Sequence, residues 1–295
     1  MVRLRRLSDR PVLQPIPEHR WERSAVFNCA AVYRDNVFHL IYRASDLPGH
    51  DRYGPYVSTM GHAVSLDGVS FARLSTPAFE GEGRQELRGV EDPRIAEMGG
   101  AYYMMYTAFG GSCDEDYRVS MASSPDLRHW TRHGVVLDEP NKDAALFPAR
   151  VGGRYAMFHR RWPDIWIAFS DDLSGWCDHT AIMHPIPGTW ESERIGIAGP
   201  PFRVDGGWAL IYHGVDPNNA YRLGWALLDP ENPTKVIHRQ SEPILEPELE
   251  WEREGWVSNV VFSCGQIVTD GKVYVYYGAA DTCIGVAVAD VAQFK

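Results

Sequence analysis

The sequence predicts an all-β fold, a single five-bladed β-propeller domain spanning residues 1–295. One pattern recurs along the chain: a small or apolar run, a tight polar turn, and then an aromatic-rich strand. The period of roughly 50 to 65 residues leaves room for three or four strands per repeat, which is typical of propeller blades. The turns carry Gly-Gly or Asp-Gly pairs, which supply the positive φ angles that hairpin turns need.

The five repeats are expected in chain order, each opening with two strands joined by one of these turns. The strand pairs cover residues 28–43, 92–107, 144–160, 199–213 and 260–277. A third strand that ends in a Ser or Asp turn follows each pair, at 63–68, 122–126, 168–172, 226–229 and 288–290. Five blades follow from this count.

The two ends of the chain are expected to close the ring. Residues 11–15 followed by Trp21-Glu22 match residues 243–247 followed by Trp251-Glu252, a segment that falls where the outer strand of the fourth blade should lie. The fifth repeat has only three strands, so the N-terminal segment would complete it and leave no open edge. The alternative is two β-sandwich domains, but no linker or composition shift divides the chain.

The composition indicates a globular protein of the cytoplasm. Hydrophobic residues make up 44% of the chain and charged residues 23%, and the net charge is −10. This balance, with no basic block beyond residues 3–6, argues against nucleic acid or an anionic membrane as partner. No apolar run approaches the roughly 18 residues of a membrane helix, and no signal peptide is recognisable. The five cysteines lack CxxC spacing and are expected to be free thiols.

In a propeller, the start of each first strand and the end of each second strand emerge on one face. The residues expected there are Asn28, Tyr42, Arg43, Asp92, Thr107, Lys142, Asp143, His159, Arg160, Gly199, Tyr212, His213, Asn259 and Asp281. This set is more polar and more cationic than an axial core requires. It predicts a site for an anionic or polyhydroxylated ligand.

Residues 89–94, with the sequence Gly-Val-Glu-Asp-Pro-Arg, are the centre of this predicted site. They place two carboxylates and a guanidinium around Pro93, which fixes its own φ and stiffens the residue before it. Asp92 is therefore the candidate for a precisely held acid. The alternative interpretation is a strand-entry turn with a surface ion pair.

Six segments, taken in order, resemble glycoside hydrolase family 130, the β-mannoside phosphorylases and related β-mannosidases. The segments are 89–94, 142–148, 158–160, 199–201, 211–214 and 277–281, and the resemblance runs from about Pro11 to Val288. It implies a five-bladed propeller with Asp92 as general acid. It also implies that Asn28, Arg43, Asp143 and Asp281 hold the mannosyl ring. Phosphate would be bound by Arg160, His213 and Tyr221, with Lys142 nearby and Arg194 where many members have Lys.

The resemblance predicts an inverting phosphorylase that cleaves a β-mannoside, of the manno-oligosaccharide or mannosyl-glucose type, with inorganic phosphate to give α-mannose 1-phosphate. A hydrolase would need a second carboxylate to activate water, whereas phosphate needs cations that pair with its charge. The alternatives are an inverting β-mannosidase of the same family, a family 43-type glycosidase and a non-catalytic sugar-binding propeller.

The acceptor side is less defined. The loop 46–56 and the aromatic residues Trp162, Trp166 and Trp190 are candidates for stacking on the second sugar, and the linkage is left open. No metal site or nucleotide-binding loop is recognisable, so phosphate is expected as co-substrate without a cofactor. The expected partners are the oligosaccharide and phosphate, not nucleic acid or membrane, and a homo-oligomer is left open.

Overall fold

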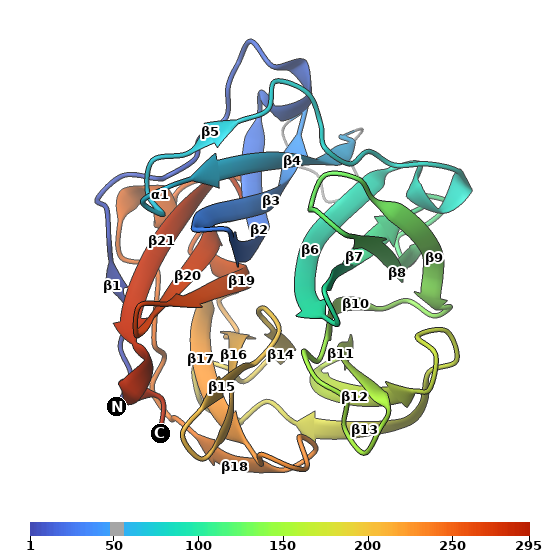
Figure 1. Ribbon diagram of the computed structural model, residues 1–295. Helices are drawn as coiled ribbons and strands as arrows, with labels where there is room; N and C mark the ends of the chain where they lie inside the picture. The colour runs from blue at the N-terminus through green and yellow to red at the C-terminus, as the bar shows by residue number, and fades with distance from the viewer. Residues whose placement is uncertain (48–55) are drawn as a thin grey trace.

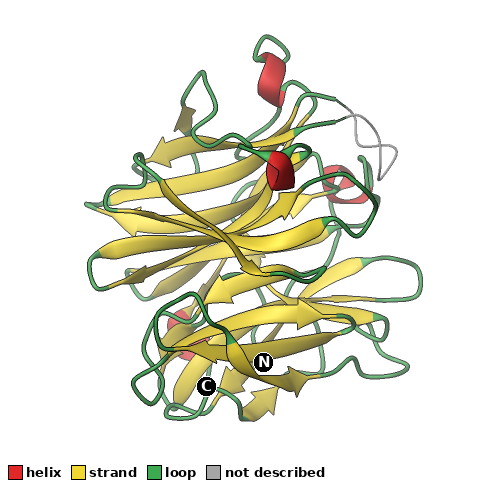
Figure 2. Ribbon diagram, turned by 90° about the vertical axis from the view of Figure 1, so that its right-hand side faces the viewer, coloured by secondary structure: helices red, strands yellow, loops and turns green. Residues whose placement is uncertain are grey.

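The computed structural model describes residues 1–47 and 56–295, and nearly all of its regular structure is β-strand (Figure 1, Figure 2). The predicted all-β fold is confirmed. The described helices are single turns: η1 (Arg20–Glu22), η2 (Arg84–Glu86), α1 (Glu250–Arg253) and η3 (Val291–Gln293). None of them is long or apolar enough to cross a membrane.

The first sheet joins two antiparallel groups of four strands. Its strands are β2 (Ala25–Arg34), β3 (Val37–Ser45), β4 (Ser58–Ser65), β5 (Ala72–Arg73), β6 (Gly89–Met98), β7 (Ala101–Phe109), β8 (Tyr117–Ser124) and β9 (Thr131–Leu137). One parallel pairing, Ser58 with Gly89, connects β4 to β6. Gly89 has a φ of 102°, and a Cβ there would lie 2.0 Å from the Ser58 carbonyl oxygen, so only glycine fits.

The remaining strands form three smaller sheets. The second sheet contains β10 (Lys142–Leu146), β11 (Tyr155–Arg161), β12 (Asp164–Ser170) and β13 (Cys177–Met183). The third contains β14 (Arg194–Ile197), β15 (Phe202–Val204), β16 (Gly207–Val215), β17 (Tyr221–Leu228) and β18 (Val236–Arg239). The fourth contains β19 (Val261–Thr269), β20 (Lys272–Ala279), β21 (Cys283–Asp290) and β1 (Arg5–Arg6).

The strands expected from the repeats are present, with one difference in the fourth repeat. Its first strand begins at Arg194, before the expected position, and is split into β14 and β15, both of which pair with β16. Pro200 and Pro201 separate the two pieces. Proline has no N–H to donate to a strand ladder, which accounts for the interruption.

The strand groups follow one another around a common centre, with β2, β6, β10, β14 and β19 innermost (Figure 1). β2 packs between β19 and β6, and β10 contacts both β6 and β14. The chain ends lie close together, because β1 pairs with β21 through Arg5–Val288 and Arg6–Ala287. This arrangement brings the starts of the innermost strands to one region.

The hydrophobic core lies between neighbouring strand groups. One cluster joins Ala30 and Ile41 of the first group to Met104 and Tyr106 of the next. Another joins β16 and β17 to β20 and β21 around the buried Trp225. Burial of these faces fixes how adjacent groups pack, and with it the positions of the strand ends that bear polar residues.

A buried tyrosine–glutamate–arginine contact recurs in four strand groups. In the first, Tyr42 donates its hydroxyl to Glu22 at 2.8 Å, and Arg73 binds the same carboxylate at 2.9 Å. The corresponding trios are Tyr106–Glu86–Arg132, Tyr212–Glu191–Arg239 and Tyr277–Glu252–Arg6. Each ties a connecting segment to its strand group.

The group β10–β13 departs from this pattern. His159 stands where the other groups have tyrosine, and its two ring nitrogens contact Asn141 and His179, each at 3.0 Å. Burial, followed by His179 and Arg161, lowers the pKa of His159 to about 3, so the ring is neutral. This variant group is also the one that carries Lys142, Asp143 and Arg160.

Candidate active site

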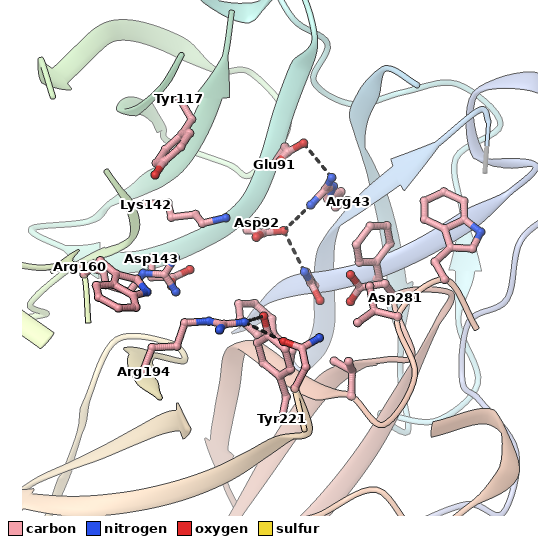
Figure 3. Close-up of a pocket in the computed structure, with 18 of the residues that line it drawn as sticks. Arg43, Glu91, Asp92, Tyr117, Lys142, Asp143, Arg160, Arg194, Tyr221 and Asp281 are labelled. Atoms are coloured by element: carbon pink, nitrogen blue, oxygen red, sulfur yellow. Dashed lines mark hydrogen bonds and ion pairs between the residues drawn. The ribbon is translucent and has the colours of Figure 1, made fainter. Parts of the chain in front are cut away.

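A cavity of about 590 Å³ opens where the innermost strands begin (Figure 3). It gathers residues from all the strand groups and from the segments between them. The polar lining residues are Asn28, Arg43, Glu91, Asp92, Asn141, Lys142, Asp143, Arg160, Arg194, Asn219 and Asp281, and the aromatic ones are Phe27, Tyr56, Tyr117, Trp162, Tyr221, Trp256 and Phe262. Such a mixture suits a ligand with many hydroxyls and a charged group.

Three of the polar side chains are directed into the cavity by the same backbone device. Asn28, Asp92 and Asp143 each sit at a register shift of a first strand, with φ angles of 46°, 51° and 55°. A bulge with a left-handed residue redirects a side chain that would otherwise follow the pleat. Asn and Asp tolerate this conformation better than other non-glycine residues.

Asp92 lies deep in the cavity with two side-chain partners on one carboxylate oxygen. Asn28 Nδ2 donates to Oδ1 at 2.9 Å, and Arg43 Nη1 is 3.3 Å from the same oxygen. Asp92 is 7% exposed, and its Oδ2 has no hydrogen bond within the described part of the chain. The carboxyl group is thus held from one side and can reach a ligand from the other.

Asp143 lies on the neighbouring side of the cavity, between two arginines and a histidine. Arg94 Nη2 is 3.1 Å from Oδ1, Arg160 Nη1 is 2.7 Å from Oδ2, and His213 Nε2 is 3.7 Å from Oδ2. Burial alone would raise the pKa of Asp143, but Arg160 and Arg94 hold it well below its usual range. Asp143 is therefore an anion, and it fixes the position of Arg160.

His213 does not line the cavity, although the sequence predicts it there. It is fully buried behind Asp143 and packs against Phe262, with ring centroids 4.5 Å apart. Burial lowers its pKa to about 3, and neither ring nitrogen has a hydrogen-bond partner in the described chain. His213 is a neutral side chain that touches the cavity only indirectly, through Asp143 and the rings of Phe262 and Tyr221.

The other predicted phosphate-binding residues all line the cavity. Arg194 Nη2 donates to Tyr221 at 2.6 Å and to Asn219 at 3.0 Å, and the other guanidinium nitrogens have no hydrogen-bond partner among the described residues (Figure 3). The Lys142 ammonium lies 5.5 Å from the centre of the Tyr117 ring and has no carboxylate partner in the part of the chain that the structure describes. Burial, followed by Arg160, lowers the pKa of Lys142. These cations are available to an anionic ligand.

Asp281 is the carboxylate in the cavity without a hydrogen bond in the described chain (Figure 3). It follows Ala280, and both residues have left-handed φ angles, 52° for Asp281 and 46° for Ala280. Burial raises the pKa of Asp281 to about 6, against the opposing charge of Arg43. Its oxygens are free to accept hydrogen bonds from a sugar.

The aromatic rim differs from the expectation. Trp162 lines the cavity and is 70% exposed, whereas Trp166 and Trp190 do not line it. Trp190 stacks on Tyr212, and its indole donates to the Ser241 carbonyl at 2.8 Å. Of the predicted loop 46–56, residues 48–55 lie outside the described chain, and Tyr56 lines the cavity.

Sequence reasoning missed several lining residues, among them Phe27, Tyr117, Asn219, Trp256 and Glu91 as a separate site residue. Phe27 and Glu91 directly precede predicted residues, so the strand starts could have indicated them. Asn219 and Tyr117 lie at turns and strand starts away from the innermost strands, where no repeat position marks them. In the described chain, no three His, Cys, Asp or Glu side chains form a metal-binding group.

A carboxyl group on one side of a sugar-sized cavity and several cations on the other define a carbohydrate-active enzyme that also takes an anion. The comparison with known families agrees with this class. A family model for glycoside hydrolase family 130, described as beta-1,4-mannooligosaccharide phosphorylase, matches residues 5–294. The chain belongs to glycoside hydrolase family 130.

Two individual relatives align with this chain over its whole length. A 1,2-beta-oligomannan phosphorylase from Thermoanaerobacter sp. (strain X514) is 60% identical, and a beta-1,2-mannobiose phosphorylase from the same strain is 56% identical, each with 100% of both chains covered. The solved structure of beta-1,2-mannobiose phosphorylase from Listeria innocua, in complex with beta-1,2-mannobiose, is 25% identical. It superposes with a TM-score of 0.90 over 98% of this chain and 97% of that one.

Proposed function

We propose that the protein is an inverting phosphorylase that cleaves a β-mannoside with inorganic phosphate and releases α-mannose 1-phosphate. The observation that carries this proposal is the pairing, in one cavity, of Asp92 with a cationic side formed by Lys142, Arg160 and Arg194. Phosphate is already an anion and needs no general base, but it needs cations when it leaves water.

The residues divide the reaction between them. Asp92 gives its proton to the glycosidic oxygen, while a phosphate oxygen attacks the anomeric carbon from the opposite face and the bond to the acceptor sugar breaks. Asn28, Arg43, Asp143 and Asp281 are proposed to hold the mannosyl ring. Arg160, Arg194, Tyr221 and Lys142 are proposed to bind phosphate, with His213 supporting them through Asp143.

We propose a β-1,2-linked mannoside as substrate. The two relatives at 60% and 56% identity carry names with this linkage, whereas the matching family model is described by a β-1,4 activity. Trp162, Tyr117 and Tyr56 on the cavity wall are the candidates for contact with the acceptor sugar.

A second candidate is hydrolysis of the same bond. Asp281 favours it, because a carboxylate without a hydrogen bond in the described chain could activate a water molecule. The two functions differ in their need for phosphate.

The deciding experiment measures β-1,2-mannobiose turnover with and without orthophosphate, alongside 1,3- and 1,4-linked mannobioses. We expect phosphate-dependent release of mannose 1-phosphate and little turnover without phosphate. Asp92→Asn should reduce the rate by about 10²–10⁴-fold, because the general acid is lost. Glu97→Gln, an exposed change on the same strand, should leave it unchanged. Free mannose formed equally fast without phosphate would establish the hydrolase instead.

We also infer the finer architecture. The eight-stranded sheet divides at its single parallel pair into two groups, which gives five groups around the centre with β1 completing the last. This supports a five-bladed propeller that forms one domain. The five cysteines are free thiols, which fits the reducing cytoplasm.

A further inference from the structure

Glu91, the neighbour of the proposed acid Asp92, is not among the residues proposed to hold the sugar or to bind phosphate. It lines the cavity, is 8% exposed, and carries a carboxylate directly before Asp92 in the chain. Because successive residues of a strand point to opposite faces, two adjacent carboxylates would normally diverge. The bulge at Asp92 instead turns both toward Arg43.

The Arg43 guanidinium contacts these two carboxylates at different distances. Arg43 Nη2 donates to Glu91 Oε1 at 2.7 Å, while Nη1 is 3.3 Å from Asp92 Oδ1. Ser58 Oγ accepts from Arg43 Nε at 3.0 Å and lies 3.4 Å from Glu91 Oε1. The contacts of Arg43 are therefore centred on Glu91, and Asp92 receives the longer one.

The remaining charges around Glu91 do not replace this contact. Lys142 favours the ionised form of Glu91, whereas Asp92 and Asp281 add negative charge near it. Arg94 and Lys142 are the other cations that interact with Asp92. Burial raises the pKa of Glu91, and Arg43 is the main group that opposes this rise. Arg43, at 2.7 Å from Glu91 Oε1, is thus the main charge that favours the ionised form of Glu91 against burial.

We propose that Glu91 is a positioning residue that draws Arg43 away from Asp92 and so allows Asp92 to keep the proton it must donate. A general acid has to be protonated before the reaction, and a cation bound to it would favour the ionised form. An ionised Glu91 beside Asp92 opposes a second negative charge and binds the cation itself. This inference rests on the proposed function, because it needs Asp92 to act as an acid.

The test is the pH dependence of kcat/KM for phosphorolysis in Glu91→Gln. The Gln amide carries no charge to pair with Arg43, so the guanidinium can pair with Asp92 alone. A cation paired with Asp92 favours its ionised form, and the alkaline limb of the profile should therefore move to lower pH by roughly one pH unit. At pH values above the limb, a displacement of that size makes kcat/KM about tenfold lower than in wild type. Glu91→Asp, whose carboxylate sits one methylene further from Arg43, should move the limb in the same direction by less.

Ser58→Ala is the matched control, because it removes a contact of both Arg43 and Glu91 without changing charge. Its limb should stay within a few tenths of a pH unit of the wild-type limb. Gln also resembles a protonated glutamic acid, so an unmoved limb in Glu91→Gln would mean that Glu91 is neutral in the working enzyme, and the inference would be wrong. If Glu91→Gln does not fold, a moved limb in Glu91→Asp decides in its place, and an unmoved limb there overturns the inference.

The outcome separates this inference from the proposed function. A wild-type protein without phosphate-dependent turnover would refute the function. An active wild type whose alkaline limb is unchanged in Glu91→Gln, or in Glu91→Asp if the Gln variant does not fold, would refute the role of Glu91 alone.

Discussion

At the scale of single residues, the site depends on side chains held in conformations that are unfavourable elsewhere. Asn28, Asp92 and Asp143 all have positive φ at strand bulges, and Asp281 has positive φ in the turn between β20 and β21. Left-handed conformations persist when the surrounding contacts enforce them, and such residues cluster at active sites. Here the enforcing contacts are strand pairings on both sides of each bulge.

Asp281 gives a pH-dependent prediction at this scale. Its pKa is about 6 in the folded protein against 3.8 for an ordinary aspartate, so the folded state binds its proton more tightly than the unfolded state. Stability should therefore fall as the pH rises from about 4 to 6, and the full loss should remain at pH 7. Asp281→Asn cannot ionise, and we expect its melting temperature at pH 7 to exceed that of wild type by a few degrees.

Thermal unfolding at pH 4 and at pH 7 checks this expectation. At pH 4 the gain should nearly vanish, because the wild-type carboxyl group is then protonated in the folded protein. Asp290→Asn, at the exposed end of the same strand group, should change neither value. An Asp281→Asn protein that is less stable at pH 7 would contradict the raised pKa.

At the scale of strands, the sequence predicts where the strands lie but not the position of Trp190, which packs at one of the Tyr–Glu–Arg contacts. The alternating apolar runs and Gly-containing turns predict the strands, because both signals are local. The position of Trp190 depends instead on contacts with Tyr212 and Ser241, which are remote from it in sequence. The pair Trp190-Glu191 matches Trp21-Glu22 and Trp251-Glu252, and all three tryptophans stack on the tyrosine of a contact, with centroids 5.9–6.1 Å apart.

The proposed site residues show the same division. The motif around Pro93 predicts Asp92, and strand ends predict Arg43, Arg160 and Asp281, all of which line the cavity. The burial of His213 behind Asp143 could not be predicted, because it depends on the missing side chain of Gly196, where a Cβ would lie 2.5 Å from the His213 ring. Register and cross-strand contacts of this kind appear only once the strands are paired.

Tyr42→Phe tests the contribution of the Tyr–Glu–Arg contact. The change leaves the fully buried Glu22 with one donor fewer, so we expect the free energy of unfolding to fall by about 1–3 kcal/mol. Chemical denaturation provides the measurement. Tyr33→Phe is the control, since the Tyr33 hydroxyl has no hydrogen bond in the described chain, and its effect should stay below about 0.5 kcal/mol. Equal losses in the two variants would count against a specific contribution.

At the scale of the whole molecule, the pairing of the chain ends completes the last strand group. Arg6 of β1 reaches Glu252 with Nε and Nη2, both at 2.7 Å, and Tyr277 donates to the same carboxylate at 2.8 Å. The Glu252 side chain is fully buried. The first residues of the chain thus provide the cation for a carboxylate near its end.

Arg6→Ala should therefore destabilise the protein by about 3–5 kcal/mol, because it leaves a buried carboxylate without its cation. Arg3→Ala is the matched control on the same segment. The Arg3–Glu246 pair is 3.6 Å long and its side chains are 51% and 37% exposed, so its loss should cost less than about 1 kcal/mol. Denaturant unfolding of both variants provides the measurement. If Arg6→Ala lowered the free energy of unfolding no more than Arg3→Ala does, the role of Arg6 in joining the two chain ends would be contradicted.

Arg94 has a wider effect than its place in one strand suggests. Fully enclosed, it donates to the backbone carbonyls of Asp92, Ile197 and Ala198 and to the carboxylate of Asp143. It thus acts as a strut between three segments that are remote in sequence. The in-line displacement proposed above tolerates little change in the separation of proton donor and nucleophile, and the contacts of Arg94 would hold Asp92 and Asp143 at a fixed separation for it.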